Sequence, residues 1–204
     1  MQHAQTQLTM LSQILQLPDN STHSLLVRHS DRDKIAKGTF GNDVPLNEKG
    51  LQNALAFGQG LSGLKINRIF SSPVGRCIQT AEQIRKGCGQ DIEIFESNAL
   101  GLPGLHINDE VAAGSYFLEH GLHKIYEQFV EGIEMPGMVH RDDLGKILTE
   151  FIVGNSAESG LTIFVSHDSL ITQYRYCLDQ TIYTRENWLD FLSGLLLTDG
   201  KLQK

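Results

Sequence analysis

The stretch Ser24-Leu25-Leu26-Val27-Arg28-His29-Ser30 contains an uninterrupted apolar run that ends in polar residues. A run of this kind, without helical spacing, is typical of a strand buried on both faces of a parallel sheet. In open α/β sheets the binding crevice lies just outside the carboxyl ends of the strands. Arg28 and His29 therefore stand where a ligand binds. From this segment alone, a solvated Arg28 and an ordinary loop histidine at His29 are an equally good alternative to a binding role.

The same pattern returns late in the chain. Residues 161–166 form a second strongly apolar run, and His167 and Asp168 follow it directly. Asp168 also suits the start of a helix, so an ordinary helix-capping role is its alternative. Two core strands thus each deliver a histidine at the carboxyl end.

A third junction lies between these two. Residues 67–71 read as a short strand, and Ser72-Pro73 predicts a helix with Ser72 as its N-cap. Arg76 falls in the first turn of that helix, where its charge opposes the positive end of the helix dipole. This position indicates an anionic partner outside the helix, although a solvated surface arginine is the alternative.

The rest of the chain alternates helical and extended patterns. Helices are expected over 2–17, 46–63 (N-cap Asn47), 73–87, 141–153 and 168–178, and strands over 91–95 and 191–197 with a hairpin at 199–200. Residues 31–45 form a long polar loop that holds Phe40 and Asn42 and is either a binding loop or a disordered one. Residues 97–140, rich in glycine, are predicted to be an inserted cap with one helix near 115–130.

Composition narrows the class of protein. The chain has 204 residues, a formal net charge of -7, 40% hydrophobic and 20% charged residues, as expected of one soluble domain spanning 1–204 that binds neither nucleic acid nor anionic membrane. The first 20 residues show no secretory signal, and no apolar run could cross a membrane. Three cysteines without metal-type spacing suit the cytoplasm. His120 and His123 lack a third partner, so no metal site is predicted.

Arg28, His29, Arg76 and His167 would meet in one crevice if their strands are neighbours. Such a group suits a dianion with several oxygens, because arginines neutralise phosphoryl oxygens through forked donors. A neutral histidine can attack phosphorus and form a phosphohistidine. Asp168 could protonate the departing alkoxide and then accept a proton from water. The predicted reaction is hydrolysis of a small phosphorylated substrate.

These residues also carry a family resemblance. LLVRHS at 25–30, SSPVGRCIQTAEQI at 71–84 and FVSHD at 164–168 resemble, in order, the signature segments of the histidine phosphatase superfamily, the phosphoglycerate-mutase-like proteins. The resemblance implies a three-layer α/β/α sandwich with a mostly parallel sheet. It implies His29 as nucleophile and His29, Arg28, Arg76 and His167 as phosphate-binding residues, with no metal or organic cofactor.

The chain departs from the family pattern at particular positions. Ser30 replaces the usual glycine, which leaves the backbone less free. NALGLPG at 98–104 lacks the glutamate that many members use as proton donor, which favours Asp168, with Glu96 and Asp31 as substitutes. Asp31-Arg32-Asp33 stands where mutases carry a tryptophan-asparagine signature, so hydrolysis is favoured over a phosphomutase.

The main rival function is an inactive module that binds phosphate or a phosphoprotein. Retention of His29, His167 and a candidate acid argues against it. A cysteine phosphatase is excluded because Gln83, Ile94 and Tyr183 stand where its arginine would follow each cysteine. Arg32, Phe40 and Asn42 are expected at the mouth of the pocket. The sequence does not identify the substrate or the oligomeric state.

Overall fold

The structure is a computed structural model that describes residues 12, 14–15, 21–156 and 159–203. The helix predicted over 2–17 lies almost wholly outside these residues. Within the described part of the chain, one six-stranded sheet has the order β3-β2-β4-β1-β5-β6. The strands are β1 Thr22–Arg28, β2 Ile66–Ser71, β3 Ile94–Glu96, β4 Gly160–Ser166, β5 Gly194–Thr198 and β6 Lys201–Leu202.

The sheet is parallel from β3 to β1 and antiparallel at β5 and β6. The two apolar runs of the sequence, β1 and β4, pair in parallel, with Arg28 opposite Ser166. On its other side β4 pairs with β2, with Val165 opposite Ser71. The three strand ends that carry the candidate site residues are therefore direct neighbours.

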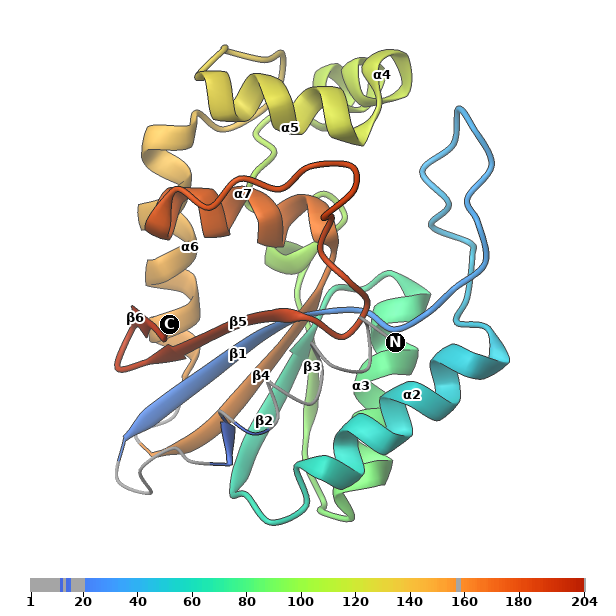
Figure 1. The fold of residues 1–204 in the computed structure, drawn as a ribbon, viewed down its shortest axis with the longest axis vertical. Coiled ribbons are helices and arrows are strands. Elements are labelled where there is room, and N and C mark those ends of the chain that lie inside the picture. Colours follow the sequence, from blue (N-terminus) through green and yellow to red (C-terminus); the bar gives the residue numbers. More distant parts are fainter. Residues whose placement is uncertain (1–11, 13, 16–20, 157–158, 204) are drawn as a thin grey trace.

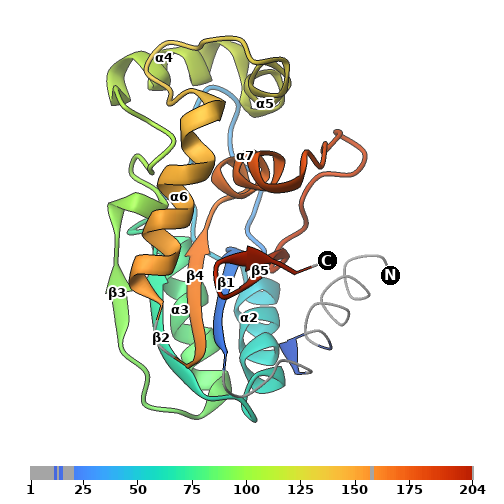
Figure 2. The ribbon, with the colours of Figure 1, turned by 90° about the vertical axis from the view of Figure 1, so that its left-hand side faces the viewer.

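Helices cover both faces of the sheet (Figures 1 and 2). The helices are α2 Glu48–Gly60, α3 Gly75–Cys88, α4 Glu110–His120, α5 Leu122–Glu131, α6 Arg141–Asn155 and α7 Asp168–Asp179, with a 3-10 turn η1 at Asn98–Leu100. Figure 2 shows α2 and α3 on one face and α6 on the other, while α4 and α5 lie beyond the carboxyl ends of the strands. The predicted α/β class, with helices on both sides of a central sheet, is confirmed.

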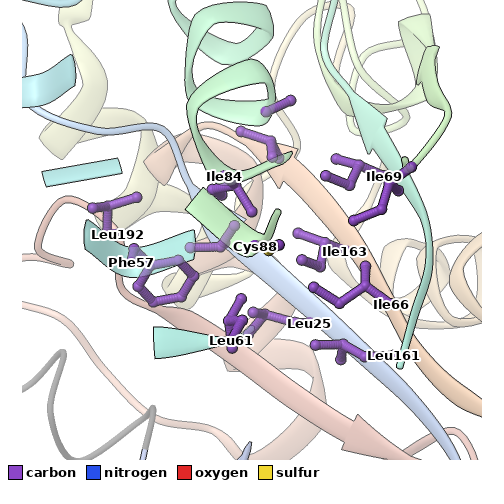
Figure 3. Packing of buried hydrophobic residues seen from close by; sticks show 14 of the residues in the cluster. Leu25, Phe57, Leu61, Ile66, Ile69, Ile84, Cys88, Leu161, Ile163 and Leu192 are labelled. Atoms are coloured by element: carbon purple, nitrogen blue, oxygen red, sulfur yellow. The ribbon is translucent and has the colours of Figure 1, made fainter. Parts of the chain in front are cut away.

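Each face of the sheet has its own hydrophobic core. Leu25 of β1 and Ile163 of β4 face α2 and α3, where they join Phe57 and Ile84 (Figure 3). Leu26, the next residue of β1, joins the core under α5, α6 and α7. This alternation is why the apolar run of β1 is continuous, since both sides of the strand are buried.

Helices α2 and α3 approach each other closely at two glycines. A Cβ on Gly58 would lie 2.2 Å from the carbonyl oxygen of Ile84, and a Cβ on Gly87 would lie 2.2 Å from that of Leu55. Gly87 was predicted to end its helix, but it lies within α3, and Gly89 ends the helix in a left-handed conformation. A glycine at position 87 is therefore explained by the close packing of α2 and α3 and not by the end of a helix.

Several predicted element boundaries are wrong. Helix α3 begins at Gly75 with Val74 as N-cap, so Ser72 does not cap it. The strand predicted over 91–95 is the shorter β3, the late strand begins at Gly194, and α2 ends at Gly60. The single helix expected near 115–130 is two helices, because Gly121 adopts a φ of 75° between them.

The break at Gly121 also separates His120 on α4 from His123 on α5, so they do not share a helix face. No helix in the described ranges combines the length and apolar character needed to cross a membrane. The hairpin predicted at Asp199-Gly200 joins β5 to β6.

Candidate active site

The three predicted junctions meet at the carboxyl edge of the sheet. His29, Arg76 and His167 line one cavity of about 520 Å³. The imidazole centroids of His29 and His167 lie 5.5 Å apart in an edge-on arrangement. The cavity is bounded on the far side by the loop after β1, the segment after η1 and helices α4 and α5.

Arg76 holds the two histidines together. Its Nε donates to His29 Nε2 at 3.0 Å, and its Nη2 donates to His167 Nδ1 at 3.3 Å. Its Nη1 donates to the carbonyl oxygen of Gly41 at 2.6 Å, which anchors the loop after β1. The side chain is buried, and burial lowers its pKa below the ordinary value for an arginine. A buried guanidinium with these contacts is placed to hold an anion.

The contacts of His29 define its tautomer. Nδ1 lies 2.8 Å from the carbonyl oxygen of Ser30, which can only accept a hydrogen bond, so Nδ1 carries the proton. Nε2 accepts from Arg76, so its lone pair is directed at that guanidinium. Burial, His167 and the two arginines Arg28 and Arg76 lower the pKa of His29 well below 6.5. The ring is therefore neutral near neutral pH, and its Nε2 lone pair becomes available when Arg76 turns to another acceptor.

His167 is also a neutral ring. Burial and Arg76 lower its pKa to about 3. Nδ1 accepts from Arg76, so Nε2 carries the proton and donates to Ser72 Oγ at 3.0 Å. A Cβ on Gly101 would lie 2.4 Å from this hydroxyl and 2.8 Å from Nε2. The position of the ring thus depends on Ser72 and on the absence of a side chain at Gly101.

Arg28 lies beside these residues but is not among the described residues that line the cavity. Its Nη2 forms an ion pair with Asp168 Oδ2 at 2.7 Å, and its Nη1 donates to the carbonyl oxygen of Leu189. The guanidinium also lies 4.2 Å above the ring of Phe191. Its guanidinium therefore lies behind the site, directed at Asp168.

Asp168 lines the cavity as the first residue of α7. Oδ2 accepts from Arg28 and from Trp188 Nε1, the latter at 3.0 Å, and Oδ1 accepts from the backbone N–H of Ser169 at 3.0 Å. Burial by itself raises the pKa of Asp168, but Arg28 and Trp188 outweigh it and hold the pKa below 3.8. The carboxylate is therefore ionised. The N-cap of α7 is His167, so the alternative of Asp168 as an ordinary N-cap is wrong.

The three residues expected at the mouth all line this cavity: Arg32, Phe40 and Asn42. The Phe40 ring stacks on Phe117 of α4 with centroids 5.5 Å apart, which joins the loop after β1 to the cap helices. The substitute acids do not line the cavity. Asp31 binds Lys49 and Asn53, and Glu96 is exposed at the end of β3.

Further polar residues of the cavity were missed by sequence reasoning: His106, Glu110 and Gln173. His106 and Gln173 are buried, and His106 Nδ1 and Gln173 Oε1 have no hydrogen-bond partner among the described residues. Neither lies in a motif or at a strand end, so the sequence carries no signal for them. The described residues also contain no group of three or more His, Cys, Asp or Glu side chains arranged to hold a metal ion.

The buried histidines make stability depend on pH. Burial lowers the pKa of His106 to about 4, and His29 and His167 are shifted in the same direction. Below pH 6.5 the histidines of the unfolded chain bind protons while those buried in the folded chain do not, so the first pH unit lowers stability by about 1 kcal/mol for each such group. Going from about pH 6.5 to 5.5 should lower the free energy of unfolding by about 3 kcal/mol, measured by urea unfolding.

The variant His106→Leu should recover about 1 kcal/mol of that loss, because its unfolded chain has one histidine fewer to protonate. Gln173→Met, which changes a buried residue of the same cavity that does not titrate, is the matched control and should leave the pH slope unchanged. A pH slope identical in wild type and His106→Leu would contradict the neutral, buried state of this ring.

Comparison with known proteins finds similarity to one family over part of the chain. The sequence profile described as Histidine phosphatase superfamily (branch 1) matches residues 24–100. The probable phosphoglycerate mutase GpmB of Cronobacter sakazakii is 39% identical over 69 residues, which make up 33% of this chain and 32% of that protein. A similar match to the same protein of Salmonella choleraesuis has 41% identity over 69 residues. The aligned part thus spans about a third of the length of the curated relatives.

Solved structures share the fold over most of the chain. The phosphoglycerate mutase of Bacillus anthracis superposes with a TM-score of 0.61 at 18% identity, covering 91% of this chain and 92% of that one. A phosphoserine phosphatase of Entamoeba histolytica superposes with a TM-score of 0.54 at 20% identity, covering 89% and 93%. At these identities the likeness establishes the common fold.

Proposed function

We propose that the chain is a member of the histidine phosphatase superfamily and that it hydrolyses a phosphomonoester through a covalent phosphohistidine at His29. One observation carries the proposal. The His29 ring is neutral, its Nδ1 proton is held by Ser30, and its Nε2 lone pair meets Arg76 beside His167. A nucleophile and the groups that would bind phosphoryl oxygens are thus in mutual contact.

In the first step the Nε2 lone pair of His29 attacks phosphorus while the bond from phosphorus to the ester oxygen breaks. Arg76 transfers its hydrogen bonds from the imidazoles to the non-bridging oxygens, where forked donors neutralise the charge that spreads in the transition state. The carbonyl oxygen of Ser30 keeps its hydrogen bond to Nδ1 and so stabilises the ring as it becomes cationic.

In the second step water attacks the phosphohistidine, and the ring of His29 leaves as a neutral imidazole. Asp168 takes a proton from that water, which its ionised state suits. The same low pKa limits Asp168 as a proton donor in the first step, because only a small fraction is protonated near neutral pH. Alcohols that leave easily as anions should therefore depend less on protonation by Asp168.

The leaving group tests this role. For Asp168→Asn, kcat/KM should fall at least about 100-fold for an alkyl phosphate and much less for p-nitrophenyl phosphate, since p-nitrophenolate needs no proton to depart. The value of kcat/KM reports only the steps up to departure of the alcohol. The loss of Asp168 as the base in the second step therefore does not affect it. Asp179→Asn, which makes the same exchange at the far end of α7 outside the cavity, is the control. Equal losses for both substrates would count against Asp168 as the acid.

Gly101→Ala should damage the site without touching a reacting group. The added methyl group overlaps Ser72 Oγ and His167 Nε2, so both must move, and displacements of about 1 Å cost about 100-fold in rate. Gly75→Ala is the matched control, because a Cβ there meets nothing within 4 Å. Both variants are compared by kcat/KM for an aryl phosphate and by thermal unfolding. Full activity in Gly101→Ala would show that the position of His167 is not limiting.

The proposal is tested by incubating the protein with a panel of phosphomonoesters and measuring released inorganic phosphate, with and without a chelator. Release that depends on His29 and survives chelation supports a metal-free phosphatase. Conversion of an ester into its positional isomer without release of phosphate would identify a phosphomutase. Background rates equal to those of His29→Ala for every ester would indicate a phosphate-binding module.

A further inference from the structure

The cavity is much larger than a phosphoryl group requires. His29, Arg76 and His167 occupy one end, and most of the remaining wall is apolar, contributed by the loop after β1, residues 101–107 and helices α4 and α5. A volume of about 520 Å³ falls among pockets that enclose whole organic ligands. The wall beyond the phosphoryl end must therefore accommodate the organic part of the ester.

The mouth of the cavity exposes large apolar side chains. Phe40, Leu102, Val111 and Leu118 all line it, and they are 43%, 38%, 79% and 44% exposed. Apolar groups gathered on a surface in this way mark a binding site. The hydroxyl groups of a sugar phosphate would lose water against these side chains without gaining hydrogen bonds. The wall therefore favours an apolar organic group.

The charges of the wall disfavour a second anionic group on the ligand. Apart from Arg76, the guanidinium of Arg32 is the one arginine or lysine side chain among the described residues that line the cavity. Arg32 Nη1 donates to the carbonyl oxygen of Asp33 at 2.9 Å, and Nε has no hydrogen-bond partner among the described residues. Glu110 lines the same cavity and would repel a carboxylate, whereas the charge of Asp168 is paired with Arg28.

Two buried polar groups interrupt the apolar wall. His106 is 8% exposed and Gln173 is 1% exposed, and His106 Nδ1 and Gln173 Oε1 lack hydrogen-bond partners within the described chain. Burial keeps the His106 ring neutral, so it can accept a hydrogen bond. Buried polar atoms without partners are costly, and a ligand hydroxyl or amine would satisfy them.

Resting on the phosphatase reaction proposed above, we infer that the substrate is the phosphomonoester of an aromatic or branched apolar alcohol that also carries a hydrogen-bond donor, which His106 and Gln173 recognise. The neutral hydroxyl or amine of such a compound would bind His106 and Gln173 while its phosphoryl group binds Arg76. Phosphoesters with a carboxylate or several hydroxyl groups are poorer ligands.

Phosphonates test this inference without turnover. Calorimetry with methylphosphonate, naphthylmethylphosphonate and phosphonoacetate should give naphthylmethylphosphonate at least about tenfold lower Kd than methylphosphonate, because the ring buries apolar surface. Phosphonoacetate should bind no tighter than methylphosphonate. Equal affinities, or tightest binding of phosphonoacetate, would overturn the inference.

Surface variants locate the effect. Val111→Asn replaces an exposed wall residue without adding charge and should remove most of the preference for naphthylmethylphosphonate over methylphosphonate. Val153→Asn is the matched control, because Val153 is 48% exposed on α6, away from this cavity. The same loss in both variants would place the apolar site elsewhere and overturn the inference.

The polar pair is tested with two esters that differ only in a hydroxyl group, benzyl phosphate and its hydroxymethyl derivative. Wild type should prefer the hydroxyl-bearing ester in kcat/KM by at least about fivefold, and Gln173→Met or His106→Leu should abolish that preference. A preference that persists in both variants, or is absent in wild type, overturns the assignment. If neither phosphonates nor inorganic phosphate bind, the proposed function itself fails. Binding as expected with no ester hydrolysed refutes the phosphatase reaction alone.

Discussion

His29→Gln should lower kcat/KM for every phosphomonoester at least about 10⁴-fold, because a side-chain amide has no lone pair able to attack phosphorus. Glutamine keeps a polar group of similar reach beside Arg76, so the pocket should still bind inorganic phosphate. The measurement pairs released phosphate with the Kd of phosphate from calorimetry. Lost turnover with retained binding separates the nucleophile from a merely structural histidine.

A covalent intermediate gives a second measurement. Wild type mixed with a radiolabelled phosphoester and quenched in alkali, in which phosphohistidine survives, should retain label that acid removes. His29→Gln should retain none, while His120→Gln, a histidine outside the cavity, should match wild type. Label that persists in His29→Gln would place the nucleophile on another residue.

The convergence of the site could be predicted because its determinants are local. Each of the three junctions is a short apolar run followed at once by its polar residues, and neighbouring parallel strands bring such ends together. Arg76, as the second residue of α3, needed only the strand before it. His29, Arg76 and His167 therefore lie in one cavity, as their spacing predicted.

The orientation of Arg28 could not be predicted in the same way. Its guanidinium is fixed by Asp168, by the carbonyl oxygen of Leu189 and by the ring of Phe191. The last two lie in the irregular segment between α7 and β5, which has no periodic pattern to place it. The position of a residue at a strand end predicts which part of the fold its side chain lies in. The orientation of a charged side chain depends on partners that are distant in the sequence.

The outer wall of the cavity was predicted only in outline, as a cap over 97–140 with one helix near 115–130. Helices α4 and α5 are short, and the break at Gly121 removes the long periodic pattern that would have shown two helices. His106 and Gln173 come from two different parts of the chain and join the cavity only in the folded structure. The residues that would determine substrate specificity are therefore harder to predict from the sequence than the candidate catalytic residues.

Arg76→Lys should lower kcat/KM about 100- to 1,000-fold although the positive charge is conserved. The guanidinium reaches His29 Nε2, His167 Nδ1 and the carbonyl oxygen of Gly41 through three separate nitrogens. An ammonium group is a single point and cannot hold both rings, the loop after β1 and the phosphoryl oxygens in one geometry. Transition-state donors of this kind contribute about 100- to 1,000-fold each.

Arg85→Lys is the control for Arg76→Lys, since it makes the same exchange on an exposed turn of α3. Because Arg76 also anchors Gly41, the lysine variant should show faster proteolysis of the loop at residues 31–45, and phosphate should no longer protect it. Activity within about fivefold of wild type would mean that charge alone suffices at this position. The forked contact between the two histidines would then have no part in catalysis, and phosphoryl binding would have to be assigned to other groups.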